Sequence, residues 1–303
     1  MTLSLSALRK INPYIKCFDI SMTEGIQSIS KYYSIENKKV ILNNIMKQYK
    51  PKTLEIGALG KDKVYPNMKN SYELYKYANS FYNNNNMTNR LAKNNKCDFY
   101  LLVPPTKKYL NIAKNLNIRN ISLQTSISDN FQIQKFNQNI KETKENIKDI
   151  LKTPGSFDNV KLYVSCITNC PIKGNQGNPD NEYIINELYE YFNIDGITNI
   201  CIVDTCADMK YNNFKHIIDY LGIELNFKFD KLSLQLHINK NNDKNNTNNI
   251  DSIIEYAVSN NIYNFDVIIE NIVNSSFTKN NKLNNNITYD RLYESLYNYN
   301  KYV

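Results

Sequence analysis

The segment Lys161-Leu-Tyr-Val-Ser-Cys-Ile-Thr-Asn-Cys170, followed by Pro171, decides the fold class of this chain. Its first half is a short run of residues that favour β-strands, and its second half is small, polar and thiol side chains before a turn. A strand that stops at such residues is typical of the open end of a parallel barrel, where binding and catalytic side chains lie. The segment therefore predicts a strand whose carboxyl end faces a functional site.

Segments of strand and helix character alternate on both sides of this strand. The expected strands are Tyr14–Ile20, Thr53–Gly57, Asp98–Val103, Asn120–Leu123, Val160–Val164, Asn199–Val203, Leu232–Leu236 and Asp266–Ile269. The expected helices are Ser34–Tyr49, Ser71–Tyr82, Lys107–Leu116, Gln132–Lys152, Asn181–Phe192, Asn212–Leu221, Ile250–Ser259 and Tyr289–Tyr297. Repeated βα units imply parallel strands, and 303 residues suit an α/β protein with one (β/α)8 TIM-barrel domain over residues 1–303. An open doubly wound sheet is the alternative, but no Gly-x-Gly-x-x-Gly follows the first strand.

The composition describes a globular, basic chain. Hydrophobic residues make up 42% of it, and its net charge is +8. The lysines are spread among asparagines, so we interpret the charge as a solvated surface and do not expect a nucleic-acid partner. The many asparagines are typical of an AT-rich genome, and the clusters at residues 83–86 and 239–249 are expected to be polar loops.

The cysteines and the amino-terminal residues predict a reduced, intracellular and cytoplasmic setting. The six cysteines lie largely in apolar runs, and residues 1–10 do not resemble a signal peptide. No run of about 18 apolar residues occurs, so we expect no membrane span. Cys166 and Cys170 lack a second ligand pair at zinc-site spacing, and we expect them to line the barrel as small apolar residues.

Polar side chains that follow the expected strands are the candidate site. They are Glu24 after the first strand, Glu55 in the second, Asp204 after the sixth, Gln235 and His237 at the seventh, and Asp266, Glu270 and Asn271 at the eighth. Glu24, Gln235 and His237 offer oxygen and nitrogen donors that suit Mg2+ or Mn2+ better than a closed zinc site. From spacing alone, His237 is equally well explained as a structural residue.

Three stretches resemble the 3-hydroxy-3-methylglutaryl-CoA lyases, which are metal-dependent TIM barrels related to isopropylmalate and homocitrate synthases. They are Thr53 through Met68, Tyr163 through Pro171, and Asp204-Thr205, which is similar to the family's Gly-Asp-Thr. The resemblance implies a carbon–carbon lyase that uses Mg2+ or Mn2+ on an acyl-CoA or a 2-oxo acid, with a homodimer as one expected assembly. It also implies metal ligands at Glu24, His237 and Asn286, with help from Gln235, and catalytic roles for Glu55 and Asp204.

The chain departs from this family at the reacting centre. The family's Arg-Asp-Gly-x-Gln is Thr23-Glu24-Gly25-Ile26-Gln27 here, and its His-x-His is Gln235-Leu236-His237. The reactive-cysteine loop corresponds to residues 271–276, which hold neither glycine nor cysteine. Loss of one preorganised donor such as the arginine typically costs about 3 kcal/mol of transition-state stabilisation. Two interpretations remain, a lyase with a changed site and an inactive barrel that serves as a binding or structural protein, so the sequence leaves open whether the chain is an enzyme.

Overall fold

The structure is a computed structural model of the chain. It describes residues 13–27, 29, 31–83, 96–153, 155–172, 180–238, 243–270 and 286–299. No helix in these ranges is long and apolar enough to cross a lipid bilayer.

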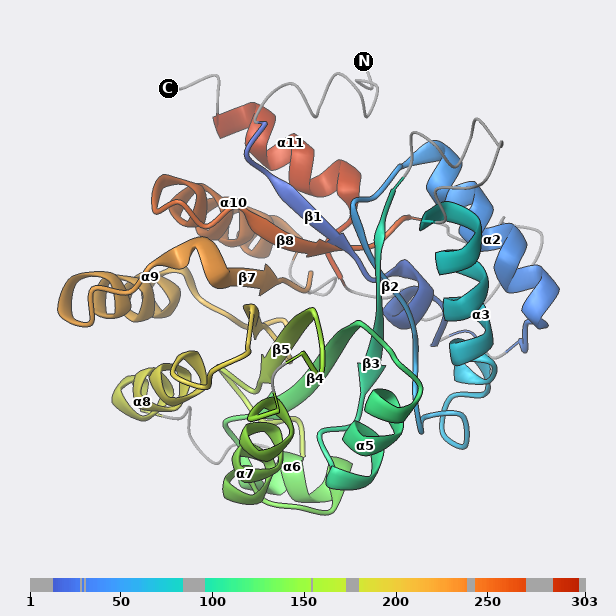
Figure 1. Cartoon of the computed structure of the whole chain (residues 1–303). Coiled ribbons are helices and arrows are strands. Elements are labelled where there is room, and N and C mark those ends of the chain that lie inside the picture. Colours follow the sequence, from blue (N-terminus) through green and yellow to red (C-terminus); the bar gives the residue numbers. More distant parts are fainter. Residues whose placement is uncertain are drawn as a thin grey trace.

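Eight parallel strands form a closed barrel in sequence order (Figure 1). The strands are β1 (Lys16–Asp19), β2 (Thr53–Ala58), β3 (Asp98–Val103), β4 (Asn120–Ser126), β5 (Asn159–Ser165), β6 (Asn199–Val203), β7 (Leu232–Gln235) and β8 (Asn264–Val267). The barrel closes where β1 pairs with β8, with Phe18 opposite Asp266. The prediction of a TIM barrel is confirmed, and the open doubly wound sheet is excluded because the two end strands pair.

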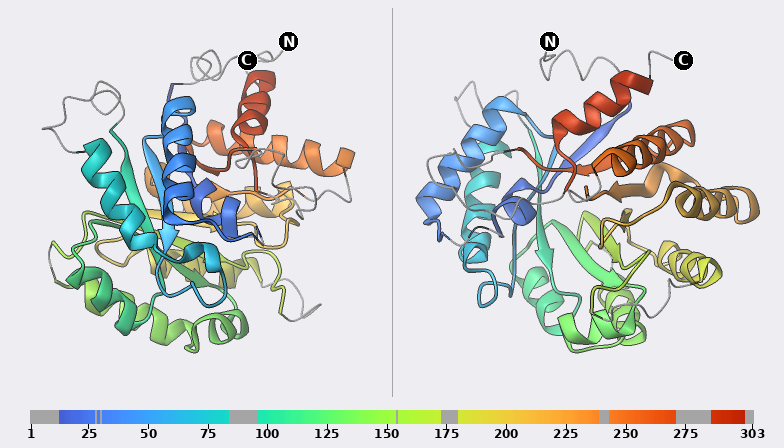
Figure 2. Two further views of the ribbon diagram at one scale, coloured as in Figure 1. Left: turned by 90° about the vertical axis from the view of Figure 1, so that its right-hand side faces the viewer. Right: turned by 180° about the vertical axis from the view of Figure 1, so that it is seen from behind.

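Helices surround the barrel and cover its outer face (Figures 1 and 2). They are α2 (Ile35–Gln48), α3 (Ser71–Ala78), α5 (Lys107–Asn115), α6 (Asp129–Phe136), α7 (Ile140–Leu151), α8 (Asn181–Phe192), α9 (Tyr211–Asp219), α10 (Asp243–Ser259) and α11 (Tyr289–Tyr299). Short turns of other helix types lie at η1 (Ser21–Gly25), η2 (Pro66–Met68), η3 (Asn79–Asn83), η4 (Tyr220–Glu224) and η5 (Phe229–Lys231). Ser34, Thr106 and Ser128 accept a backbone N–H at the starts of α2, α5 and α6, which explains where these helices begin.

The expected single helix Gln132–Lys152 is wrong, because two helices occupy this region. Asn137 follows α6 with a left-handed backbone (φ 55°), a conformation that asparagine tolerates and that ends a helix. Asn139 then starts α7 with a capping box, in which its side chain and that of Glu142 bind each other's backbone N–H groups. The apolar periodicity continues through the break, so the pattern alone does not reveal it.

The second asparagine cluster is also more ordered than a polar loop. Helix α10 begins at Asp243 and takes in part of that cluster, so the expected start at Ile250 is wrong. Asn249 accepts the backbone N–H of Tyr211 (2.8 Å) and donates to the carbonyl of Met209 (2.6 Å), so it fastens α10 to the start of α9. In the first cluster, Asn83 binds the backbone of Cys97, whereas residues 84–86 lie outside the described part of the chain.

The inside of the barrel is polar below its mouth. Lys161 on β5 forms a buried ion pair with Asp266 on β8 (Nζ to Oδ1, 2.5 Å), and Tyr163 donates to Oδ2 of the same carboxylate (2.9 Å). The Lys161 ammonium also lies 4.0 Å from the centre of the Phe18 ring. Asp266 therefore lies within its strand and pairs with interior residues, which corrects the expectation that it belongs with the polar side chains at the strand ends.

Candidate active site

The candidate site lies at the end of the barrel where the strands terminate. Parallel strands bring their carboxyl ends to one rim, which carries the functional residues in barrels of this type. The residues expected there come from separate elements, namely Glu24 from η1, Glu55 from β2, Asp204 from the end of β6, His237 from the end of β7 and Asn286 from the segment before α11.

Thr23 and Glu55 are in direct contact at this rim. The Thr23 hydroxyl lies 2.6 Å from Oε1 of Glu55 and 3.2 Å from the carbonyl oxygen of Ile20. Burial raises the pKa of Glu55 to about 7, and the Thr23 hydroxyl works against this rise. Glu55 can therefore hold or release a proton near neutral pH. When it is protonated, it can donate to Thr23, which then donates to Ile20.

The second oxygen of Glu55 and the hydroxyl of Ser122, on β4, form no hydrogen bond of good geometry among the described residues, but Ser122 lies close enough to Glu55 to lower the pKa of its carboxyl group. Glu55 is 1% exposed and Ser122 is 0% exposed, so neither atom is satisfied by bulk solvent. Buried polar groups are usually paired, and Ser122 and Glu55 are therefore partners for each other inside the barrel.

His237 is held in a defined orientation by the backbone. Its Nδ1 lies 2.6 Å from the carbonyl oxygen of Asp204, which can only accept, so Nδ1 carries the hydrogen and Nε2 has a free lone pair. Burial lowers the pKa of His237, although the charge of Glu24 opposes this, so the imidazole is neutral at neutral pH. This arrangement, with one ring nitrogen fixed and the other available, is typical of metal-binding and proton-accepting histidines.

Asp204 acts on the loop that follows β6. Its Oδ1 accepts the backbone N–H groups of Asp208 (3.0 Å) and Met209 (3.1 Å), and burial raises its pKa to about 7. Its carbonyl oxygen orients His237, as described above. Asp204 therefore positions other groups, and its proposed catalytic role would be exerted through His237.

Gln235 and Asn286 bind each other beside His237. The Gln235 amide donates to Oδ1 of Asn286 (2.8 Å), and Asn286 pairs with His237 through a short antiparallel bridge. The carboxylate of Glu24 accepts a hydrogen bond from the side chain of Gln27, and its charge acts on both His237 and Glu55. The structure thus brings Gln235, His237 and Asn286 into contact and leaves Glu24 within electrostatic reach of them.

These donors make a weak set for a divalent cation. Within the residues that the structure describes, no three His, Cys, Asp or Glu side chains are grouped so that they could hold a metal ion. A cation bound here would depend on one imidazole, one carboxylate and amide oxygens. Oxygen-rich sets of this kind suit Mg2+ or Mn2+ better than Zn2+, but the Asn286 oxygen already accepts a hydrogen bond from Gln235.

The barrel fold of this chain is also found in proteins of known structure. No protein-family model and no curated protein matches the chain. Among solved structures, the hydroxymethylglutaryl-CoA lyase of Pseudomonas aeruginosa matches with a TM-score of 0.68 and 16% identity over 90% of this chain and 82% of its own. The lyase of Brucella melitensis also has a TM-score of 0.68 and 16% identity, over 93% of this chain and 96% of its own. The Acinetobacter baumannii lyase, solved with coenzyme A and 3-methylmalate, has a TM-score of 0.69 and 16% identity over 95% of this chain and 89% of its own.

The chain has the fold of the hydroxymethylglutaryl-CoA lyases. The resemblance on which the sequence analysis relied is thereby confirmed at the level of the fold, and the low identity agrees with a divergent member of that architecture.

Residues 271–276, which the resemblance places at the reactive-cysteine loop of the lyases, lie outside the described part of the chain. Cys166, at the end of β5, is buried and has a left-handed backbone (φ 62°), with its N–H bound to the hydroxyl of Thr205 (2.7 Å). Burial raises the pKa of Cys166 to about 12 and that of Cys206 to about 11, so both are neutral thiols and poor nucleophiles at neutral pH.

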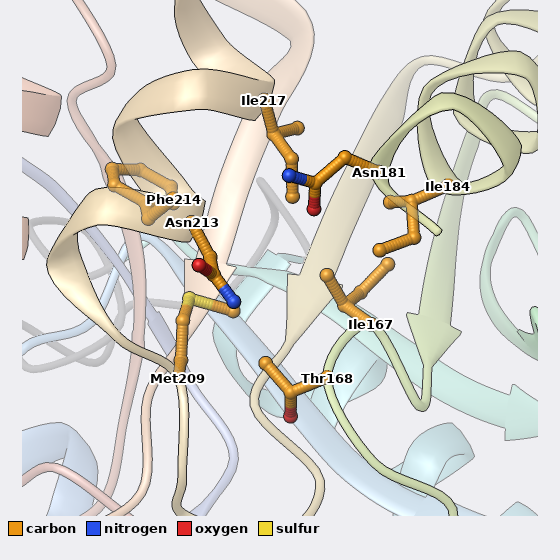
Figure 3. A pocket seen from close by; sticks show the side chains of 8 residues that line it. All are labelled: Ile167, Thr168, Asn181, Ile184, Met209, Asn213, Phe214 and Ile217. Carbon is orange, nitrogen blue, oxygen red and sulfur yellow. The ribbon is translucent and has the colours of Figure 1, made fainter. Parts of the chain in front are cut away.

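A small cavity lies beside the mouth of the lyase-fold barrel, between α8 and α9 (Figure 3). Ile184 and Ile217 form apolar walls, and the amides of Asn181 and Asn213 are the main polar groups around it. None of its lining side chains is titratable, so the cavity offers no acid, base or nucleophile.

Proposed function

We propose that this chain is a hydroxymethylglutaryl-CoA lyase-like barrel that has lost the lyase reaction and still binds an acyl-CoA or a 2-oxo acid at its mouth. The observation that carries the proposal is the contact between Thr23 and Glu55. At the place where the resemblance implies an arginine, the chain has a neutral hydroxyl that is already bound to a neighbouring carboxyl group.

The loss of the reaction follows from electrostatics. A lyase of this type must stabilise negative charge on an enolate oxygen, and a fixed positive charge does this better than a hydroxyl. Removal of such a donor typically costs about 3 kcal/mol or more, which corresponds to a loss of at least about 100-fold in rate. Thr23 cannot compensate by turning to the substrate without giving up its hydrogen bond to the buried carboxyl group of Glu55.

The retained binding function rests on groups that remain prepared for a ligand. Glu55 offers a buried carboxyl group whose pKa lies near neutral pH, and His237 keeps Nε2 available. The Acinetobacter baumannii lyase was solved with coenzyme A bound, so this fold can accommodate an acyl-CoA.

The test is calorimetric titration of the protein with hydroxymethylglutaryl-CoA and, separately, with a 2-oxo acid. Mass spectrometry of the same samples detects any cleavage of the thioester ligand. We expect saturable binding without cleavage, and we expect Glu55→Gln to weaken it while the exposed Glu36→Gln, a matched loss of one carboxylate, does not. Cleavage by the wild-type protein would refute the loss of the reaction, and lack of binding would refute the ligand class.

A second candidate is a metal-dependent carbon–carbon lyase with a remodelled site. The orientation of His237 favours it, because a histidine fixed through Nδ1 is ready to bind a metal through Nε2. Glu24, Asn286 and Gln235 would complete the set, and the metal would polarise the substrate's oxygens. Stoichiometric Mn2+ binding that EDTA reverses and His237→Ala abolishes would support this candidate, and its absence would exclude it.

A further inference from the structure

The buried side chain of Asn67 joins the loop after β2 to the segment that follows η1. Its amide nitrogen lies 3.1 Å from the carbonyl oxygen of Ile26, 2.9 Å from that of Ile29 and 3.0 Å from that of Lys31. Its amide oxygen accepts the backbone N–H of Tyr33 (2.9 Å). Asn67 is 3% exposed, so both ends of its side chain bind backbone inside the protein. Acceptors on one side and a donor on the other also fix which end of the amide is the nitrogen.

Asn67 is itself fixed to β2. It lies in the short turn η2, and the carbonyl oxygen of the next residue, Met68, accepts the hydroxyl of Ser71 (2.6 Å). The oxygen of that hydroxyl accepts the backbone N–H of Ala58, the last residue of β2 (3.1 Å). Gly57 leaves the space for this contact, because a Cβ there would clash with the side chain of Ser71. The barrel strand therefore sets the position of Asn67.

The segment that Asn67 holds begins at the turn that carries the site residues. This turn, η1, is a single π-type turn, a rare conformation that is frequent at functional sites. The N–H of Ile26 donates to the carbonyl of Thr23 at the end of the turn, and the carbonyl of Ile26 accepts from Asn67. The hydroxyl of Thr23 in turn binds Glu55 on β2. A closed path of hydrogen bonds thus runs from β2 through Asn67 and η1 back to β2.

We infer that Asn67 is a positioning residue of the barrel mouth, which holds η1 against β2 and thereby sets the place of the Thr23 hydroxyl relative to Glu55. Its side-chain hydrogen bonds go to backbone groups, so it acts through the loop. An aspartate in its place would set a second acceptor against three carbonyl oxygens, so the site requires an amide. The inference deepens the proposed function and rests on it only for the effect on ligand binding.

The experiment measures the titration of Glu55 in Asn67→Ala without any ligand, from the protonated carboxyl band in infrared difference spectra recorded against pH. The pKa of Glu55 should rise above its wild-type value by about 0.5–1 unit, because the loosened turn weakens the hydrogen bond from Thr23. In a Thr23→Val background, Asn67→Ala should add no further shift, because it acts through that hydroxyl. Asn67→Ser, which keeps one donor, is the second variant in case Asn67→Ala does not fold.

Asn83→Ala is the matched control for the loss of a backbone-binding amide. The amide of Asn83 donates to the carbonyl of Cys97 (2.8 Å) and accepts its N–H (3.3 Å), next to the start of β3 and so at the other end of the barrel. Its removal should leave the titration of Glu55 unchanged. An equal shift in Asn83→Ala would overturn the inference.

The outcomes separate a positioning role from a structural one and from the proposed function. A normal titration of Glu55 in folded Asn67→Ala or Asn67→Ser, with only a lower free energy of unfolding, would show a structural residue and overturn the inference. Calorimetric titration with hydroxymethylglutaryl-CoA should show weaker binding by Asn67→Ala than by Asn83→Ala. A shifted titration of Glu55 together with no binding of the thioester by the wild-type protein would retain the positioning role and refute the proposed ligand.

Discussion

The hydroxyl of Thr23 lies 2.6 Å from Oε1 of Glu55, so a residue that follows β1 is bound to a carboxyl group on β2. Burial raises the pKa of this carboxyl group to about 7, and the hydrogen bond from Thr23 opposes the rise. This hydrogen bond also occupies the hydroxyl at the position where the resemblance to the lyases implies an arginine.

Replacement of Thr23 by valine should raise the pKa of Glu55 above about 7. The hydroxyl lowers this pKa, and its loss leaves burial as the dominant influence. Infrared difference spectroscopy of the protonated carboxyl band, followed against pH, measures the shift. Thr53→Val is a suitable control, because that hydroxyl binds the carbonyl of Cys17 and does not contact Glu55. An unchanged titration of Glu55 in Thr23→Val would contradict the role of the contact.

The stability of the protein should fall as the pH rises from about 5 to 8. Burial raises the pKa of Glu55 and of Asp204 to about 7 and that of Asp19 to about 6. The folded state therefore binds protons that the unfolded chain has already released above pH 4–5, and this stabilisation is lost as the pH passes through the folded-state values. Glu55 alone contributes about 3 kcal/mol to this trend by the relation between pKa and free energy.

The Glu55→Gln variant isolates this contribution. It should have a flatter dependence of the free energy of unfolding on pH than the wild-type protein, measured by urea denaturation at several pH values. The lowered pKa of His237 acts in the opposite direction below about pH 6.5, and it is common to both proteins. If the free energy of unfolding depends on pH equally in the two proteins, folding does not raise the pKa of Glu55.

Much of the fold could be predicted from local sequence because its strands are short, apolar and bounded by polar turns. Strand β3 and helix α8 have the limits that the sequence predicts. The break between α6 and α7 could not be predicted, since it depends on the left-handed backbone of one asparagine within a continuous apolar pattern. The interior pair Lys161–Asp266 joins residues 105 positions apart, and no local pattern contains that information.

The candidate site was predicted only in part for a similar reason. The resemblance to the lyases pointed to Gln235, His237 and Asn286, and these three lie together. The contact of His237 with a backbone carbonyl involves no side chain of Asp204, so residue type carries no signal for it.

Removal of one partner of the buried ion pair should destabilise the protein strongly. Asp266→Asn leaves the Lys161 charge without compensation in a site where the two side chains are 0% and 3% exposed, and such changes typically cost about 3–5 kcal/mol. Urea denaturation of this variant, of Lys161→Met and of the double variant gives the coupling energy. Asp158→Asn, which breaks the exposed pair with Arg119, should cost less than about 1 kcal/mol. If Asp266→Asn and Asp158→Asn lowered the free energy of unfolding by similar amounts, the buried pair Lys161–Asp266 would be contradicted.

The capping box of α7 should contribute measurably to stability. Asn139→Ala removes the side chain that accepts the N–H of Glu142 (2.8 Å), and loss of such a cap costs about 1 kcal/mol. Lys141→Ala, an exposed change in the first turn of the same helix, should stay within about 0.5 kcal/mol of the wild-type value. If α6 and α7 formed one continuous helix, the two variants would have similar stability.

The most direct test of the account is a single experiment that records binding and cleavage of hydroxymethylglutaryl-CoA together. The protein is treated with EDTA, divided into samples with and without Mn2+, and mixed with the thioester; calorimetry measures the dissociation constant and mass spectrometry measures the products. The account predicts saturable binding in both samples and intact thioester after prolonged incubation. Cleavage that depends on Mn2+ would contradict the loss of the reaction, and no heat of binding in either sample would contradict the retained ligand site.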